Sequence, residues 1–135
     1  MKQLKTLGLK HVALYVDNLA SVAAFYCDFM GMEIEWQPDP DNIYLTSGGQ
    51  DNLALHARKS SSALASQQRL DHIGFIVESP QMVHDYFAAA KTRGIRILKE
   101  PRLHRDGATS FYLADPAETV VQIIHHPPIV KNNIA

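Results

Sequence analysis

The amino-acid sequence predicts an α+β fold made of two tandem βαβββ modules. This prediction rests on two observations: one strand pattern occurs twice, and each copy is followed by the same series of elements. HVALYV at residues 11–16 and HIGFIV at 72–77 share an initial His, a β-branched second residue, a small third residue and a final Val. A repeated strand, followed each time by a matching helix and matching later strands, indicates an internal duplication.

The first module is expected over about residues 7–57. Its first strand, 11–16, is followed by Asp17 and Asn18, which are typical N-cap residues, and then by the helix LASVAAFYCDFM. Gly31 suits the left-handed position that commonly ends a helix. Three strand patterns complete the module: MEIEW at 32–36, IYLTS at 43–47 and LAL at 53–55.

The second module is expected over about residues 70–126. Its first strand, 72–77, is followed by Ser79 and Pro80, a strong helix-start signal, and by the helix QMVHDYFAAAKTR. Gly94 is expected to end this helix as Gly31 ends the first. Three strand patterns again follow: IRIL at 95–98, FYLAD at 111–115 and VQI at 121–123.

The two modules are joined by RKSSSALASQQR, at about residues 58–69, which is polar and Ser-rich and is expected to be a linker. Residues 1–135 together are expected to form one domain, because 135 residues is an ordinary domain length. The hydrophobic fraction of 46% and the charged fraction of 20% are typical of globular proteins.

Charge and cysteine content exclude several classes of protein. A net charge of −1 argues against a nucleic-acid partner, because phosphate binding needs a basic surface. Cys27 is the single cysteine, which excludes an internal disulfide and fits a reducing compartment. No apolar run has the length of a membrane span, and no signal peptide is evident. We therefore expect a cytoplasmic protein that binds a small molecule, and neither nucleic acid nor a membrane.

Seven histidines are many for a chain of this length, and strand alternation organises several of them. Successive side chains of a strand point to opposite faces, so apolar residues such as Leu14 and Leu55 are expected to pack on the helix of their module. The opposite face then collects polar, aromatic and metal-competent side chains: His11, Tyr15, Tyr44, His56, His72, Ser110, Tyr112 and Gln122. This partition predicts a site on that face.

The segments HVALYVDNLAS, FYCDFMGME, LDHIGFIV and DGATSFYLADPAETVVQI resemble the vicinal oxygen chelate superfamily. That superfamily includes glyoxalases, bleomycin resistance proteins, extradiol dioxygenases and fosfomycin-resistance enzymes. The resemblance covers roughly residues 7–126. It implies a glyoxalase-like open barrel, in which the two βαβββ modules surround a shared cleft. One such scaffold hosts many unrelated chemistries, so the resemblance specifies the fold more closely than the reaction.

In that superfamily, the metal site takes one ligand from the first strand and one from the last strand of each module. Carried over by position, the first-strand ligands are His11 and His72, and the last-strand ligand of the second module is Gln122, where most metal-using members have Glu. The matching position in the first module is Ala54 without a gap, or His56 if the strand slips by two residues. Three His and one Gln could hold Zn²⁺, Ni²⁺, Co²⁺ or Fe²⁺. As an alternative, the three histidines could be structural, with His11 and His72 at strand entrances, and Gln122 could be a buried hydrogen-bonding residue.

Residues of both modules are expected to contact the substrate. Tyr44, Ser110 and Tyr112 are expected to line the cleft with their hydrogen-bonding ends. Arg105, in the sequence HRDG, could clamp a carboxylate or phosphonate, although the same residues also fit a solvated turn. Trp36 could shield the mouth of the cleft, but strand alternation places it on the same face as Ile34, which also permits simple packing.

Three functions remain open at this point. The first is a metal-dependent lyase or isomerase of the glyoxalase type, in which the ion binds two vicinal oxygens of the substrate. The second is a metal-free drug-binding protein of the bleomycin-resistance type, and the third is a fosfomycin-type thiol transferase. An extradiol dioxygenase is disfavoured because the carboxylate of the two-His-one-carboxylate iron site is missing. The catalytic base is not identified, no organic cofactor is expected, and a homodimer is implied by the resemblance.

Overall fold

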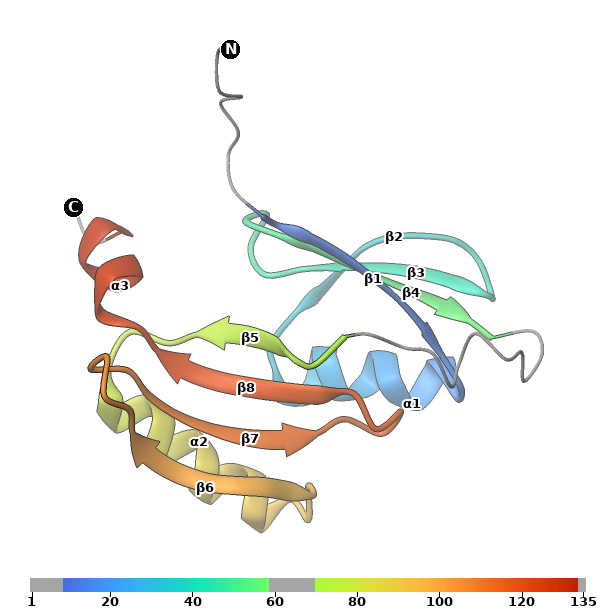
Figure 1. The fold of residues 1–135 in the computed structure, drawn as a ribbon. Coiled ribbons are helices and arrows are strands. Elements are labelled where there is room, and N and C mark those ends of the chain that lie inside the picture. Colours follow the sequence, from blue (N-terminus) through green and yellow to red (C-terminus); the bar gives the residue numbers. More distant parts are fainter. Residues whose placement is uncertain (1–8, 59–69, 134–135) are drawn as a thin grey trace. The chain divides into compact units, whose positions relative to one another are not determined.

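The structure is a computed structural model that describes residues 9–58 and 70–133. The chain divides into two compact units, residues 1–65 and 66–135, and each is described by itself. Apart from Arg58, the linker expected at 58–69 lies outside the described residues. In both units a four-stranded sheet is covered on one face by a helical segment (Figure 1). The predicted pair of βαβββ modules is therefore confirmed.

The sheet of the first unit is formed by one crossover and two hairpins. Its elements are β1 His11–Val16, α1 Leu19–Ala24, the π-helix η1 Phe25–Phe29, β2 Glu33–Asp39, β3 Asn42–Thr46 and β4 Asn52–Ala57. The strand order is β1-β4-β3-β2, with β1 parallel to β4 and the other pairs antiparallel. The helical segment after β1 carries the chain across one face of the sheet to β2 at the opposite edge. Such a crossover is needed because β1 and β4 pair in parallel.

The second unit repeats this topology. Its elements are β5 Ile73–Ile76, α2 Pro80–Thr92, β6 Ile97–Leu103, β7 Thr109–Ala114, β8 Val120–His125 and α3 Pro127–Asn133. The strand order is β5-β8-β7-β6, again with one parallel pair, β5 with β8. α3 has no counterpart in the first unit and was not predicted. It begins at a proline, a residue that is well suited to the first turn of a helix.

The two main helices end alike but begin differently. Gly31 and Gly94 have φ of 76° and 71°, so both take the left-handed conformation predicted for a helix end. Ser79 caps α2 as expected, since its side chain accepts a hydrogen bond from the Met82 N–H. Asn18 precedes α1 but makes no capping side-chain hydrogen bond, because it takes a left-handed φ of 54°. The helix therefore begins directly after Asp17 and Asn18, as predicted, but without a side-chain cap.

Apolar side chains collect between each sheet and its helix. In β1, Leu14 and Val16 are buried, whereas His11 and Tyr15 are exposed, which is the predicted alternation. α2 packs against β6, β7 and β8, and the ring of Phe87 meets that of buried Phe111 edge-on at 5.5 Å between centroids. Burial on one face leaves the other face of each sheet available for polar groups.

A β-bulge changes the predicted face of Trp36. Ile34 pairs with Leu45, but Trp36 pairs with Tyr44, because the register shifts between Ile34 and Trp36. Paired residues share a face, and an inserted residue reverses the alternation that follows it. Trp36 therefore lies on the open face with Tyr44, and the parity that grouped it with Ile34 was misleading.

The same irregularity occurs in the second unit. Ile97 pairs with Leu113, and Lys99 pairs with Tyr112, again with a register shift between the two pairs. The two units therefore share a β-bulge at matching positions, which the sequence pattern did not show. It places a long side chain, Trp36 or Lys99, beside the tyrosine of the neighbouring strand in each unit.

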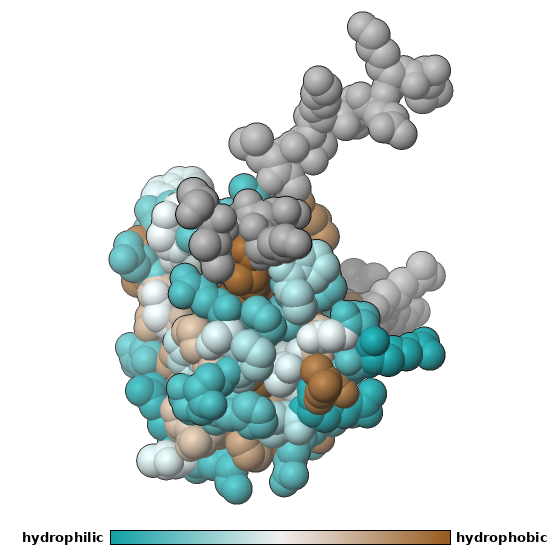
Figure 2. Space-filling model, turned by 90° about the vertical axis from the view of Figure 1, so that its left-hand side faces the viewer, coloured by the Kyte–Doolittle hydropathy of each residue, from teal (hydrophilic) through white to brown (hydrophobic). Residues whose placement is uncertain are grey.

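The face of the molecule that Figure 2 shows has the polarity of an ordinary protein surface. On the face that Figure 2 shows, hydrophilic residues cover most of the area and hydrophobic residues are scattered among them. No helix among the described residues has the length and hydrophobicity needed to cross a membrane.

We expect Gly31→Ala and Gly94→Ala each to lower the free energy of unfolding by about 1 kcal/mol, because L-residues are disfavoured at positive φ. Gly74→Ala is the matched control. Gly74 has no positive φ, an added Cβ would meet ordinary contacts at 3.7 Å, and the first unit has Ala13 at the equivalent position. Urea unfolding of the three variants measures the difference. Equal effects at all three positions would contradict the left-handed conformation of Gly31 and Gly94.

Candidate functional site

The open face of the first unit carries two histidines whose imidazole rings are held by neighbouring side chains. The Nδ1–H of His11 donates to Oδ1 of Asn52 at 2.7 Å, and the Nδ1–H of His56 donates to Oδ1 of Asn42 at 2.6 Å. Because an amide oxygen only accepts, each ring keeps its proton on Nδ1 and presents Nε2 with a free lone pair.

His56 belongs to a longer chain of hydrogen bonds. The side-chain amide of Asn42 donates to both carboxylate oxygens of Asp39, at 2.9 and 3.0 Å. The chain thus runs from the His56 imidazole through the Asn42 amide to a carboxylate at the end of β2. Such a chain fixes the orientation of the ring and the position of its proton.

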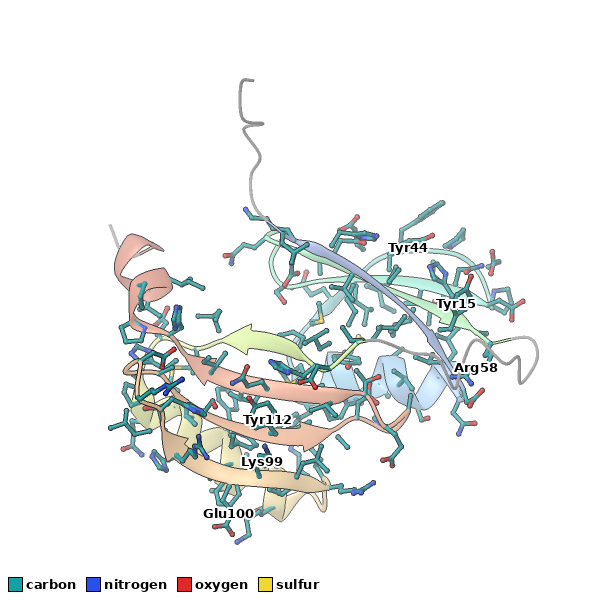
Figure 3. The ribbon with its side chains drawn as sticks, viewed as in Figure 1. Tyr15, Tyr44, Arg58, Lys99, Glu100 and Tyr112 are labelled. Atoms are coloured by element: carbon teal, nitrogen blue, oxygen red, sulfur yellow. The ribbon has the colours of Figure 1, made fainter. Side chains whose placement is uncertain are left out.

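Aromatic rings surround His56. Its ring centroid lies 5.8 Å from that of Tyr44, edge-on, and 5.9 Å from that of Tyr15. Trp36 stacks on Tyr44 at 5.1 Å. Tyr15 and Trp36 have exposed fractions of 71% and 58%, so this group of rings forms an open surface (Figure 3).

In the second unit, Gln122 is the centre of the open face. It lies on β8 opposite Gly74, where the missing side chain leaves room for the amide. Gln122 Nε2–H donates to Oγ of Ser110 at 3.0 Å, and Ser110 Oγ lies 2.7 Å from Nε2 of His104. Ser110 and Gln122 are buried, with exposed fractions of 1% and 8%. The amide therefore has a defined orientation, with its oxygen on the side of Gly74.

His72 lies one residue before β5 and shares its surroundings with Tyr112. Its Nδ1–H donates to a carboxylate oxygen of Asp71 at 2.6 Å, so Nε2 is again the free nitrogen. Its ring meets Tyr112 edge-on at 5.4 Å. Nζ of Lys99 lies 5.5 Å from the centroid of the same Tyr112 ring (Figure 3). A cation thus stands near the hydroxyl-bearing ring on this face.

The strand register identifies the position equivalent to Gln122 in the first unit. Gln122 pairs with Gly74, and Ala13, the residue equivalent to Gly74, pairs with Ala54. The ungapped match to Ala54 is therefore the structural equivalence, whereas His56 occupies the next position on the same face. Along the strands, His56 lies about 13 Å from the row of His11, given about 3.3 Å per residue.

The donor atoms present fit a divalent transition metal in type. His11, His56 and His72 each have Nδ1 anchored on a side-chain oxygen, which is the usual environment of a metal-binding imidazole. Gln122 offers an amide oxygen whose nitrogen is anchored. Among the described residues, no three or more His, Cys, Asp or Glu side chains form a metal-sized cluster.

The remaining predicted contact, Arg105, is exposed in the turn between β6 and β7. In that turn Gly107 has a φ of 90°, and the Ala108 N–H donates to Oδ1 of Asp106 at 3.0 Å. That backbone hydrogen bond lowers the pKa of the exposed Asp106 carboxyl; desolvation opposes it, and His126 and His104 add smaller lowering effects. The turn thus presents one cation and one anion.

Cys27 lies in η1 and is half-buried. Burial, with a smaller contribution from the nearby Asp28 carboxylate, raises the pKa of its thiol. A raised pKa keeps a thiol protonated and unreactive at neutral pH.

A family model for the "Glyoxalase/Bleomycin resistance protein/Dioxygenase superfamily" matches residues 8–123. The chain belongs to this superfamily. The resemblance inferred from the sequence is therefore confirmed, and the vicinal oxygen chelate proteins are its relatives. No curated protein matches the sequence.

Several solved structures share the fold. A lactoylglutathione lyase from Agrobacterium tumefaciens has a TM-score of 0.71 at 21% identity, covering 87% of this chain and 92% of its own. An integron cassette protein from the mobile metagenome of the Halifax Harbour sewage outfall has a TM-score of 0.73 at 23% identity, covering 87% and 97%. A glyoxalase/bleomycin resistance protein/dioxygenase family enzyme from Burkholderia phytofirmans has a TM-score of 0.69 at 20% identity, covering 86% of this chain and 96% of its own. At these identities the likeness shows the fold alone.

His104 was not among the predicted site residues of this superfamily member. The sequence HRDG favoured a solvated turn, but His104 is half-buried and hydrogen-bonded to Ser110. Its backbone N–H also donates to the Ala108 carbonyl, which closes the turn and directs the side chain toward β7. No local sequence signal shows that His104 contacts Ser110, because this contact depends on how the chain turns back between residues 104 and 110.

Tyr44→Leu should expose the stacked face of Trp36, the single tryptophan, so we expect a red-shifted emission and stronger acrylamide quenching. The loss of the aromatic pair should also cost about 1 kcal/mol of stability. Fluorescence and urea unfolding measure both effects. Tyr86→Leu, a substitution of an exposed tyrosine on α2, is the control. If Trp36 packed on the helix side of its sheet, neither substitution would change its emission.

Proposed function

We propose that this protein is a divalent-metal-dependent lyase or isomerase that acts on a small substrate with two neighbouring oxygen atoms. The observation that carries the proposal is the orientation of the candidate ligands. In His11 and His72 the proton is held on Nδ1, and in Gln122 the nitrogen is held by Ser110. Each hydrogen bond leaves the ligating atom of its side chain free.

The ligand set would be Nε2 of His11, Nε2 of His72 and Oε1 of Gln122. Ala54 at the fourth position provides no donor, so coordination positions would stay open for substrate oxygens. When bound, the ion would act as a Lewis acid on those oxygens. All three ligands are neutral, so the site would keep the full charge of the ion and favour an anionic substrate.

The chain's own cations support an anionic substrate. Lys99 and Arg102 of β6 pair with Tyr112 and Ser110, so both lie on the open face of the second unit. Arg105 is exposed in the adjoining turn. A carboxylate or phosphonate group is the chemistry that these side chains would bind, and the Tyr112 hydroxyl would orient the reacting end.

The proposed ligands come from both units, His11 from the first and His72 and Gln122 from the second. A homodimer is part of the proposal. Edge strands such as β2, whose residues are all exposed, would provide surfaces for pairing in a homodimer.

A second function, metal-free binding of a small molecule, is favoured by one observation. The rings of Tyr15, Trp36, Tyr44 and His56 form an open aromatic surface, which suits a planar ligand. Acidic residues accompany it, since β2 and the turn after it carry Glu33, Glu35, Asp39 and Asp41 without a Lys or Arg. Metal content separates this function from the first.

Protein purified without a His-tag should contain about one equivalent of a transition metal per site, measured by elemental mass spectrometry. His11→Ala/His72→Ala should lower the affinity for added Ni²⁺ by more than about 100-fold, since even outer-shell substitutions cost 10- to 100-fold. His84→Ala, which removes an exposed histidine of α2, should change nothing. Protein that is metal-free and takes up no Zn²⁺, Ni²⁺, Co²⁺ or Fe²⁺ would contradict the proposal.

Gln122→Glu should tighten Ni²⁺ binding by about tenfold, because an anionic oxygen replaces a neutral one. Gln122→Leu should weaken it, because the oxygen ligand is lost. The apo form of Gln122→Glu should be less stable than wild type, since the side chain at this position is buried and a carboxylate there must be desolvated. Calorimetric titration and thermal unfolding measure these effects. Unchanged affinity in both variants would exclude Gln122 as a ligand.

A further inference from the structure

We infer that His104, acting through Ser110, is a positioning residue that holds the Gln122 amide with its oxygen toward the open face of the second unit. The consequence for metal binding rests on the proposed function. The inference itself rests on the chain of three side chains described above, which joins the β6–β7 turn to the middle of β8.

The hydrogen atoms of this chain can be assigned from burial. Ser110 is 1% exposed, and its hydroxyl makes no hydrogen bond to other described residues besides those with His104 and Gln122. The Gln122 Nε2–H donates to Oγ, so the single hydroxyl proton of Ser110 has to find its acceptor at His104 Nε2. His104 then carries its proton on Nδ1. The donors run in one direction, from Gln122 through Ser110 to His104.

Reversal of this chain would reverse the amide. If Nε2 of His104 became the donor, the Ser110 hydroxyl would turn toward Gln122, and the amide would have to present its oxygen to Ser110. The NH₂ group would then lie on the side of Gly74 and the open face. An NH₂ group has no lone pair for a metal ion, so an acceptor at position 104 is what makes Gln122 a ligand.

A carboxylate at position 122 would remove this requirement. Both of its oxygens can bind a metal, so no orientation is wrong. This predicts that His104 matters when residue 122 is Gln and loses its importance when it is Glu. A merely structural contribution of His104 would be the same in both backgrounds, which makes the double-mutant cycle decisive.

The test is calorimetric titration of the full-length protein with Ni²⁺ in four forms: wild type, His104→Ala, Gln122→Glu and the double variant. We expect His104→Ala to weaken Ni²⁺ binding by at least about tenfold in the wild-type background and by less than about threefold in the Gln122→Glu background. Ser110→Ala should weaken binding as His104→Ala does, and Ser110→Thr, which keeps the hydroxyl, should restore it. An equal loss from His104→Ala in both backgrounds would overturn the inference.

A measurement on the metal-free protein separates this inference from the proposed function. In ¹⁵N-labelled wild type, the side-chain NH₂ of Gln122 should show nuclear Overhauser effects to the β protons of Ser110, and these should weaken in His104→Ala. An NH₂ group that is remote from Ser110 in wild type, or unaffected by His104→Ala, would overturn the inference. If wild type binds no metal but shows these contacts, the proposed function fails and the positioning of Gln122 by His104 stands.

Discussion

The parallel pairing of the first and last strands of each unit is the constraint on which the rest of the structure depends. It sets Ala13 against Ala54 in one sheet and Gly74 against Gln122 in the other. Because paired residues share a face, this register decides which side chains leave the helix-covered core and which are offered to a ligand. A slip of one residue would bury the histidines and expose the core.

The same strand topology supports a different network of polar side chains in each unit. The first unit holds His56 through Asn42 on Asp39, and the second holds Gln122 through Ser110 on His104. In both, the middle residue lies on the third strand of its module and satisfies the polar group of the fourth. Buried or half-buried polar groups need such partners, since an unsatisfied one would cost on the order of 1–3 kcal/mol.

Much of the fold was predictable, because strand alternation, helix-start residues and terminal glycines act locally. The six-residue repeat at His11 and His72, the cap at Ser79 and the left-handed Gly31 and Gly94 all belong to this local class. What stayed open depended on distant partners. Alternation alone could not decide the face of Trp36, because a bulge is defined by the register with the neighbouring strand.

By itself, the sequence determined two βαβββ modules, the polar character of one face of each sheet and membership of the superfamily. The tertiary structure alone decided the equivalence of Ala54 and Gln122, the ring tautomers of the histidines and the role of His104. The physical reason is range. Propensities and alternation act over a few residues along the chain, whereas register and hydrogen-bond direction depend on atoms that only folding brings within about 3 Å of one another.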